Sequence, residues 1–223
     1  VSNVWIENSN GLMVRGKLFV PEGVTERNPA PGVVYLHGYQ NNRETSEPYA
    51  IELSRRGFVA LAIDTLGRGN SDNQFSEDEE GFDPTYGGVS AFEYLCNLPM
   101  VDGNRCGMAG HSLGAEMSYT AALEDPAVKA LVIGGFAYRT DATKSVPRNM
   151  MMVFGKYDEY RKRMTGTGDF ETEWPTSPQT RAAFPVANPE LYRTYGSFAE
   201  QVKRTKRKLL AFLIAAKDEG RTI

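Results

Sequence analysis

The stretch that decides the fold is Gly110-His111-Ser112-Leu113-Gly114, a G-x-S-x-G pentapeptide. A serine hydroxyl becomes an effective nucleophile when its backbone turns sharply between a strand and a helix, which pushes Oγ out of the sheet. Glycines two positions before and two after the serine leave room for that turn. Glycine makes up 22 of the 223 residues, so the pentapeptide alone arises by chance in about one chain in ten of this composition. The flanking sequence must therefore decide.

The flanking sequence predicts the strand and the helix that the turn requires. Residues 106–109 form a short run typical of a buried strand, and residues 101–104 before them predict a turn. After Ser112, apolar residues recur at helical spacing until Asp125-Pro126 ends the pattern. The strand-turn-helix condition is met, so we expect Ser112 to have a strained backbone with φ positive or near it.

Elsewhere the chain alternates predicted strands with predicted helices. The apolar run 32–36 is typical of a parallel strand covered on both faces, and it ends in His37-Gly38-Tyr39, a loop suited to supply an oxyanion-hole N–H. The alternation predicts right-handed βαβ crossovers with helices on both faces of a mostly parallel sheet. The other expected elements are strands at 4–7 and 12–20 around the hairpin signal Asn10-Gly11, a loop at 21–31, a helix at 46–56, a strand at 58–63, a helix at 89–98, and strands at 130–133 and 150–154.

Four motifs follow one another in a familiar order: Leu36-His37-Gly38, Asp64-Thr65-Leu66-Gly67-Arg68-Gly69-Asn70-Ser71, Gly110-His111-Ser112-Leu113-Gly114 and Phe154-Gly155-Lys156-Tyr157-Asp158. Together they resemble the α/β-hydrolase superfamily over about residues 1 to 200. The branch they resemble most holds the dienelactone-hydrolase-like esterases and the catalytic domains of prolyl-oligopeptidase-like peptidases. The combination is far more specific than any one motif.

The resemblance implies a serine hydrolase that acts on carboxylic ester or amide bonds of a small molecule through an acyl-enzyme. Ser112 would be the nucleophile and Asp158, after the strand at 150–154, the acid of the triad. The backbone N–H groups of Leu113 and Tyr39 would form the oxyanion hole. In this fold the triad runs Ser, then Asp or Glu, then His.

The chain departs from that order, because its only histidines, His37 and His111, both precede Asp158. A base must come within hydrogen-bond reach of Oγ while its other nitrogen is held by the acid. We expect instead that both histidines are packed and hydrogen-bonded under the loops. The alternative function is therefore a catalytically inactive hydrolase-fold domain that serves as a binding or structural module.

The C-terminal third predicts two further features. Residues 161–188, rich in Gly, Thr and Pro, predict a lid over Ser112, a packing arm or dimer contact, or disorder. No strand pattern follows residue 200, so the final strand and the histidine loop of the fold are expected to be missing. Residues 202–214 read as a basic amphipathic helix, similar to a helix of sugar C-methyltransferases, which gives no ground for methyl transfer. The expected division is a hydrolase domain at 1–200 and a tail at 201–223 that is foreign to it.

Composition supports one soluble domain with a sizeable core, since 41% of the 223 residues are hydrophobic. No run of 18 apolar residues predicts a membrane span. The net charge of −3 and the pI near 5.6 give no reason to expect a nucleic-acid partner. Because the chain begins with Val1, we expect that a leader or an upstream segment is missing, which leaves the compartment open. The oligomeric state is also open.

The remaining polar residues predict structural roles. Cys96 and Cys106 are expected to be buried free thiols rather than a disulfide, and two Cys with two His at these spacings make no zinc signature. We expect no metal and no cofactor. The acidic run 77–80 predicts a solvated surface segment. Polar side chains at strand or turn edges are expected to pin loops rather than to bind substrate; they are Asp64, Arg68, Asp102 and Arg105.

Overall fold

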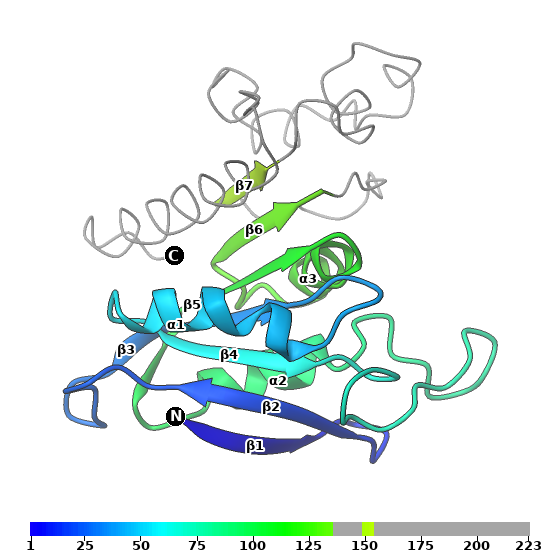
Figure 1. The fold of residues 1–223 in the computed structure, drawn as a ribbon, viewed down its shortest axis with the longest axis horizontal. Coiled ribbons are helices and arrows are strands. Elements are labelled where there is room, and N and C mark those ends of the chain that lie inside the picture. Colours follow the sequence, from blue (N-terminus) through cyan, green and yellow to red (C-terminus); the bar gives the residue numbers. More distant parts are fainter. Residues whose placement is uncertain (136–148, 154–223) are drawn as a thin grey trace, which may run out of the picture.

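The computed structural model describes residues 1–135 and 149–153. These residues form a seven-stranded sheet in the order β1-β2-β4-β3-β5-β6-β7, with helices on both faces (Figure 1). The strands are β1 (Ser2–Glu7), β2 (Met13–Phe19), β3 (Ala30–Leu36), β4 (Val59–Asp64), β5 (Val101–His111), β6 (Ala130–Gly134) and β7 (Met150–Val153). The helices are the 3₁₀ turn η1 (Arg43–Thr45), α1 (Glu47–Ser54), α2 (Gly88–Cys96) and α3 (Leu113–Glu124).

The sheet is mostly parallel, as predicted. β1 and β2 pair antiparallel, β2 pairs antiparallel with β4, and β4, β3, β5, β6 and β7 run parallel to one another. The predicted hairpin is confirmed: Gly11 adopts a positive φ of 77°, and the Asn8 side chain accepts hydrogen bonds from the N–H groups of Asn10 (3.0 Å) and Leu12 (2.8 Å). A positive φ at this point explains the glycine, because residues with a Cβ rarely adopt it.

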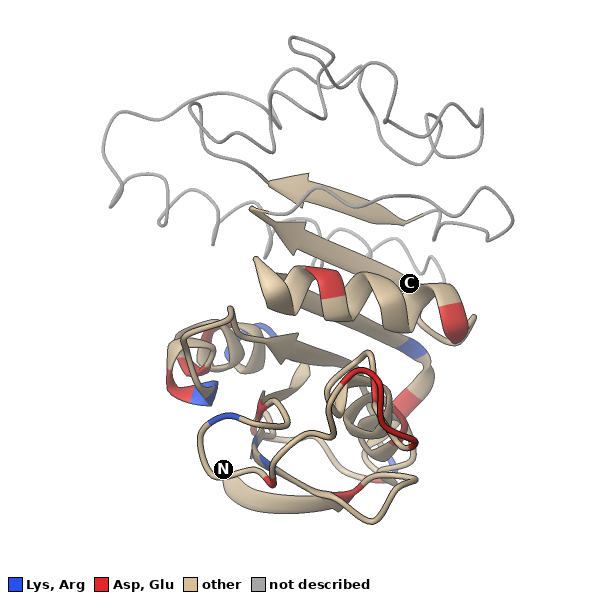
Figure 2. Cartoon of the chain, turned by 90° about the vertical axis from the view of Figure 1, so that its right-hand side faces the viewer, with Lys and Arg blue, Asp and Glu red and all other residues tan. Residues whose placement is uncertain are grey.

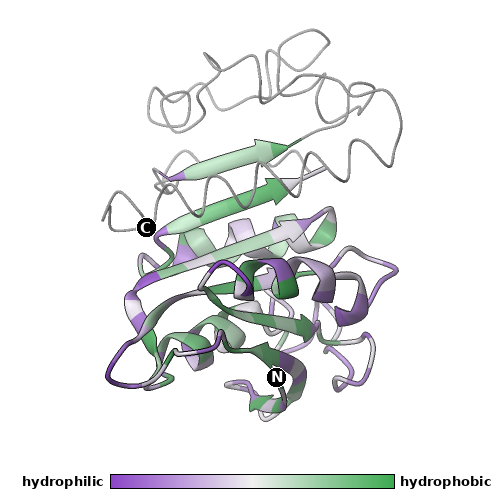
Figure 3. Ribbon diagram, turned by 60° about the vertical axis from the view of Figure 1, so that its left-hand side comes forward, coloured by the Kyte–Doolittle hydropathy of each residue, from purple (hydrophilic) through white to green (hydrophobic). Residues whose placement is uncertain are grey.

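Two cores flank the sheet because successive side chains of a strand point to opposite faces. In β4, Leu61 and Ile63 pack with α2 and α3, whereas Ala60 and Ala62 pack with Ala50 of α1. Both sets are buried, which is why residues 59–63 of β4 are apolar at every position rather than at alternate ones. Figure 3 shows this as strands that are hydrophobic along most of their length. The predicted covering of the sheet on both faces is confirmed.

The turn predicted at residues 101–104 is wrong as a boundary, because β5 already begins at Val101. The pairing passes from Ala30 opposite Val101 to Gly32 opposite Cys106, so residues 102–105 bulge out of the register. Within the bulge the Asp102 side chain accepts a hydrogen bond from the Asn104 N–H (3.1 Å). Residues 102–104 therefore form the local turn-like hydrogen bond that the sequence predicts. Because the residues before and after them both pair with β3, the segment becomes a bulge within one strand.

Several predictions fall on residues that the structure does not describe. These are Asp158, the segment 161–188, the tail 201–223 and the missing final strand. β7 corresponds to the strand predicted at 150–154 and is the last described strand of the sheet. Among the described helices, none combines the length and apolar character needed to cross a bilayer.

Candidate active site

Ser112 lies at the junction of β5 and α3 with a backbone conformation that L-residues rarely adopt. Its φ is 53° and its ψ is −120°, which confirms the predicted positive φ. The Ser112 N–H donates a hydrogen bond to the Gly134 carbonyl of β6 (2.8 Å), and its carbonyl accepts from Ala115 (2.9 Å) and Glu116 (3.1 Å). Such a conformation costs about 1–3 kcal/mol and persists only where the surroundings impose it.

The two glycines of the pentapeptide are required by close backbone contacts. A Cβ at Gly110 would lie 2.2 Å from the Gly114 carbonyl oxygen, and a Cβ at Gly114 would lie 2.3 Å from the carbonyl oxygen of Leu36 and 2.5 Å from that of His37. The first turn of α3 therefore rests directly on the ends of β3 and β5. This close approach confirms the sterically permissive role expected of the glycines.

The loop after β3 lies against the serine. A Cβ built at Gly38 would lie 3.6 Å from Ser112 Cβ and 3.5 Å from the His111 carbonyl oxygen. The N–H groups of Tyr39 and Leu113 have no hydrogen-bond partner among the residues that the structure describes. Leu113 is the first residue of α3, where the helix dipole favours negative charge. Two N–H donors without a partner in the described chain are therefore near Ser112: that of Leu113, the next residue, and that of Tyr39, in the loop after β3.

His37 is committed to structure through both ring nitrogens. The ring is 2% exposed, Nε2 accepts a hydrogen bond from the Thr65 N–H (3.1 Å), and Nδ1 donates to the Gly38 carbonyl (2.8 Å). This pairing assigns the neutral tautomer with the proton on Nδ1. Burial lowers the pKa of His37, opposed by the hydrogen bond to Gly38 and by the charge of Asp64. The expected packed and hydrogen-bonded state is confirmed for this histidine.

We expect the stability of the fold to decrease on acidification because of His37. Its pKa is lower in the folded chain than the value of about 6.5 in an unfolded chain, so the unfolded state binds the proton first. Lowering the pH from about 7 to about 5.5 should therefore cost about 1 kcal/mol of unfolding free energy at this group. Urea titrations at the two pH values measure the loss. His37→Asn should reduce the pH dependence, and an unchanged slope in this variant would contradict the assignment.

His111 differs from the expectation, because it is exposed rather than packed under a loop. Its ring lies at the end of β6, where a Cβ at Gly135 would approach Nε2 to 3.0 Å. In the β5–β6 pairing His111 lies opposite Gly134, at the carboxyl ends of both strands, which accounts for its exposure.

The loop after β4 is pinned by Asp64, which is fully buried. Its carboxylate accepts hydrogen bonds from the Arg43 side chain, the Arg43 N–H (2.8 Å) and the Asn70 N–H (3.1 Å). Gly69 has a φ of 56°, and a Cβ there would lie 2.2 Å from Asp64 Cγ. The structural role expected for Asp64 is confirmed. Arg43, which pairs with this buried charge, was missed because nothing in its sequence surroundings sets it apart.

A cavity of about 560 Å³ opens beside the Tyr39 loop. It is lined by Tyr39, Gln40, Asn41, Asn42, Glu44, Thr45, Arg68 and Gly69. It lies at the carboxyl ends of β3 and β4, where open α/β sheets bind ligands. The cavity shares Tyr39 with the candidate oxyanion hole, but neither Ser112 nor Leu113 is among its lining residues.

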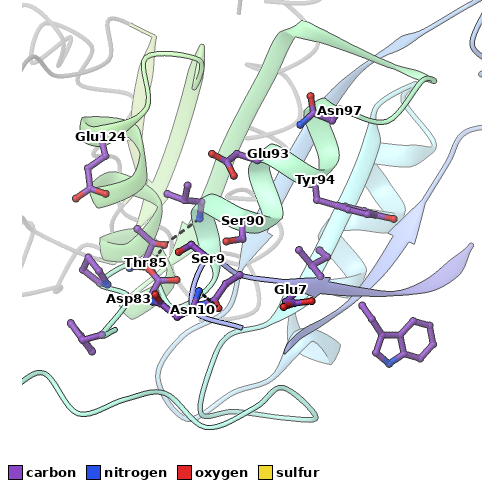
Figure 4. A pocket seen from close by; sticks show the side chains of 16 residues that line it. Glu7, Ser9, Asn10, Asp83, Thr85, Ser90, Glu93, Tyr94, Asn97 and Glu124 are labelled. Atoms are coloured by element: carbon purple, nitrogen blue, oxygen red, sulfur yellow. Dashed lines mark hydrogen bonds between the residues drawn. The ribbon is translucent and has the colours of Figure 1, made fainter. Parts of the chain in front are cut away.

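A second cavity, of about 670 Å³, lies elsewhere (Figure 4). It is lined by carboxylates from three elements, among them Glu7, Glu93 and Glu124. Glu124 is the last residue of α3 and Ser112 precedes the first, so about 18 Å of helix separate this cavity from the serine. The second cavity is not part of the candidate site.

The other polar predictions concern surfaces and thiols. The acidic run 77–80 is exposed, as predicted, and forms the continuous red stretch of the loop before α2 (Figure 2). Cys96 and Cys106 are free, as predicted. Cys96 donates a hydrogen bond to Cys106, which raises the pKa of the Cys96 thiol and lowers that of Cys106. Within the described ranges, no three His, Cys, Asp or Glu side chains gather to hold a metal ion.

The fold is that of the α/β hydrolases. Residues 27–211 match the family Hydrolase_4, described as serine aminopeptidase, S33, and the chain belongs to this family. The superfamily expectation is therefore confirmed. The narrower resemblance to dienelactone-hydrolase-like and prolyl-oligopeptidase-like proteins stays a prediction.

Individual relatives match part of the chain. An uncharacterized protein of Escherichia coli K12, YcjY, is 28% identical over 133 residues, covering 58% of this chain and 44% of that protein. The 2-(acetamidomethylene)succinate hydrolase of Mesorhizobium japonicum is 32% identical over 111 residues, covering 46% and 34%. The chain thus spans less than half the length of these relatives. The solved α/β hydrolase GrgF of Penicillium sp. sh18 shares the fold, with a TM-score of 0.51 at 23% identity over 60% of this chain and 45% of that chain.

Proposed function

We propose that the chain is a serine hydrolase domain that cleaves a carboxylic ester or amide bond of a small molecule through an acyl-enzyme at Ser112. The observation that carries the proposal is the conformation of Ser112, φ 53° and ψ −120°, between a strand and a helix and against the Gly38 loop. A nucleophilic serine of an α/β hydrolase requires this turn, and strain of this kind marks functional sites.

The Ser112 Oγ would attack the carbonyl carbon as its proton passes to a base. The carbonyl oxygen would become an oxyanion, stabilised by the N–H groups of Leu113 and Tyr39, which have no other partner in the described chain. Collapse would expel the alcohol or amine with a proton, and water would then release the acyl group and regenerate the serine. Asp158 is proposed as the acid that orients the base.

The identity of the base is the open element of this mechanism. His37 cannot serve, because its Nε2 accepts the Thr65 N–H and its Nδ1 donates to the Gly38 carbonyl. His111 is exposed beside Ser112, but we expect the sharp turn at Ser112 to direct the two side chains apart. The described residues therefore include candidates for the nucleophile and for the oxyanion donors, but neither histidine is placed to act as the base.

The substrate is proposed to be a small polar ester or amide. Most residues that line the cavity beside Tyr39 are polar, among them Gln40, Asn41 and Glu44, which suits polar acyl or leaving groups. One relative is named a hydrolase of 2-(acetamidomethylene)succinate, a small molecule with an amide. A dienelactone-hydrolase-like esterase activity and a peptidase-like activity would each restrict the proposed substrate to one of these two bond types, the ester or the amide.

Covalent trapping tests the proposal without depending on fast turnover. A fluorophosphonate should form an adduct on the peptide that contains Ser112, detected by mass spectrometry of the digested chain. Ser112→Ala should abolish the adduct, whereas Ser118→Ala, which removes a buried hydroxyl bonded to the Gly114 carbonyl, should keep it. Absence of an adduct at Ser112 in the folded wild type would favour the binding or structural module instead.

A further inference from the structure

Arg68 lies between two aromatic rings beside the candidate oxyanion hole. Its Cζ is 4.8 Å from the centre of the Tyr39 ring and 5.3 Å from that of Tyr86. Nε donates a hydrogen bond to the Tyr39 carbonyl (2.7 Å), and a terminal nitrogen donates to the Leu66 carbonyl (3.2 Å). A planar guanidinium can stack and donate in its plane at the same time, which an ammonium cannot.

Tyr86 has a strained backbone that its hydrogen bonds hold in place. Its φ is 52°, and Ser112 is the only other non-glycine residue with a positive φ in the described part of the chain. The Tyr86 carbonyl accepts a hydrogen bond from the Leu66 N–H (3.0 Å), so the segments that carry Tyr86 and Arg68 are tied together. The strained residue therefore presents its ring to Arg68 from a fixed position.

The ring and the carbonyl of Tyr39 have few other restraints. Tyr39 is 64% exposed, and on its N-terminal side the Gly38 carbonyl accepts hydrogen bonds from the Asn41 N–H (3.1 Å) and from His37 Nδ1 (2.8 Å). These bonds hold the peptide unit that carries the Tyr39 N–H, whereas Arg68 Nε (2.7 Å) holds the next peptide unit through the Tyr39 carbonyl. Arg68 therefore completes the restraint of the residue whose N–H is the candidate donor.

We propose that Arg68 is a positioning residue that holds the Tyr39 N–H toward the carbonyl oxygen of a substrate at Ser112. The inference rests on the proposed function, because it assigns Arg68 a part in the same reaction. Arg68 does not itself touch the substrate in this role. It acts through Tyr39, and its contact with the Tyr86 ring helps to hold the guanidinium in place. Small displacements of an oxyanion donor reduce the rate, because the stabilisation depends on geometry.

The test combines a dynamic and a kinetic measurement on the 223-residue chain. Arg68→Met should lower the order parameter of the Tyr39 N–H, from ¹⁵N relaxation, from about 0.85 to below about 0.6. The Ser112-dependent kcat for p-nitrophenyl acetate should decrease about 10- to 100-fold while KM changes little. Arg68→Lys should behave like Arg68→Met, since charge alone does not restore the planar contacts.

Arg15→Met is the matched control. Arg15 also stacks on an aromatic ring, at 5.5 Å from the centre of Trp5 on the β1–β2 hairpin, so its loss removes the same kind of contact away from the site. It should leave the Tyr39 order parameter and kcat unchanged. An unchanged order parameter in Arg68→Met, a lower one without loss of kcat, or full kcat in Arg68→Lys would overturn the inference. If the wild type shows no Ser112-dependent turnover, the proposed function fails, and the order parameter alone decides whether Arg68 holds Tyr39.

Discussion

Gly114→Ala is expected to destabilise the fold by about 3–5 kcal/mol, a large share of the 5–15 kcal/mol that stabilises a typical domain. A methyl group at this position would lie 2.3 Å from the Leu36 carbonyl oxygen and 2.5 Å from that of His37. Both obstacles are backbone atoms of the central strand and the loop after it, so they cannot turn aside as a side chain would. Alanine would gain about 1 kcal/mol in helix propensity, which is too little to offset the collision.

Urea denaturation of the two proteins at one pH measures the difference. Gly23→Ala is the matched control, because no atom lies within 4 Å of its Cβ position although its φ is 79°. That variant should lose only about 1 kcal/mol, from backbone strain alone. Equal stability of the two variants would show that α3 does not approach β3 as closely as the structure describes.

Exogenous imidazole is expected to accelerate the Ser112-dependent hydrolysis of p-nitrophenyl acetate at least about 10-fold, because a general base is worth about 10²- to 10⁴-fold. The chain contains only two histidines, and His37 is buried with both nitrogens engaged. Without a base the Ser112 hydroxyl stays protonated near neutral pH. Small imidazole can enter beside Ser112 and accept that proton.

Imidazole also hydrolyses the ester by itself, so each rate is corrected with Ser112→Ala at the same imidazole concentration. His111→Gln is the second comparison, because His111 is exposed next to the serine. It should change neither the basal nor the accelerated rate. Fast turnover without imidazole that His111→Gln abolishes would identify His111 as the base and refute the expectation.

The pentapeptide around Ser112 shows which parts of the site can be predicted from sequence. The positive φ at Ser112, the steric need for Gly110 and Gly114, and the loop that follows β3 were all expected from short segments. Each depends on neighbours within a few residues, where glycine and apolar spacing have direct conformational consequences. The role of Ser112 as a nucleophile stays a proposal, and Asp158 lies outside the described residues.

Other features of the site join residues far apart in the chain. Arg43 pairs with Asp64 at a separation of 21 positions, and Arg68 binds the Tyr39 carbonyl at a separation of 29. The only sequence signal for the positive φ of Tyr86 is the pair of glycines that follows it, Gly87 and Gly88. The exposure of His111 also depended on tertiary structure, since it lies where the pairing of β5 with β6 ends, opposite Gly134.

Amino-acid order alone was enough to specify the alternation of strands and helices, the two buried faces of the central strands and the sharp turn at Ser112, because propensity and apolar periodicity act locally. Tertiary structure alone decided that residues 102–105 bulge within β5, that His37 is locked by Thr65, and that Arg68 lies between two tyrosines. These outcomes depend on which segments the sheet brings side by side. No local pattern encodes such contacts, since their free energy exists only once distant parts of the chain have packed together.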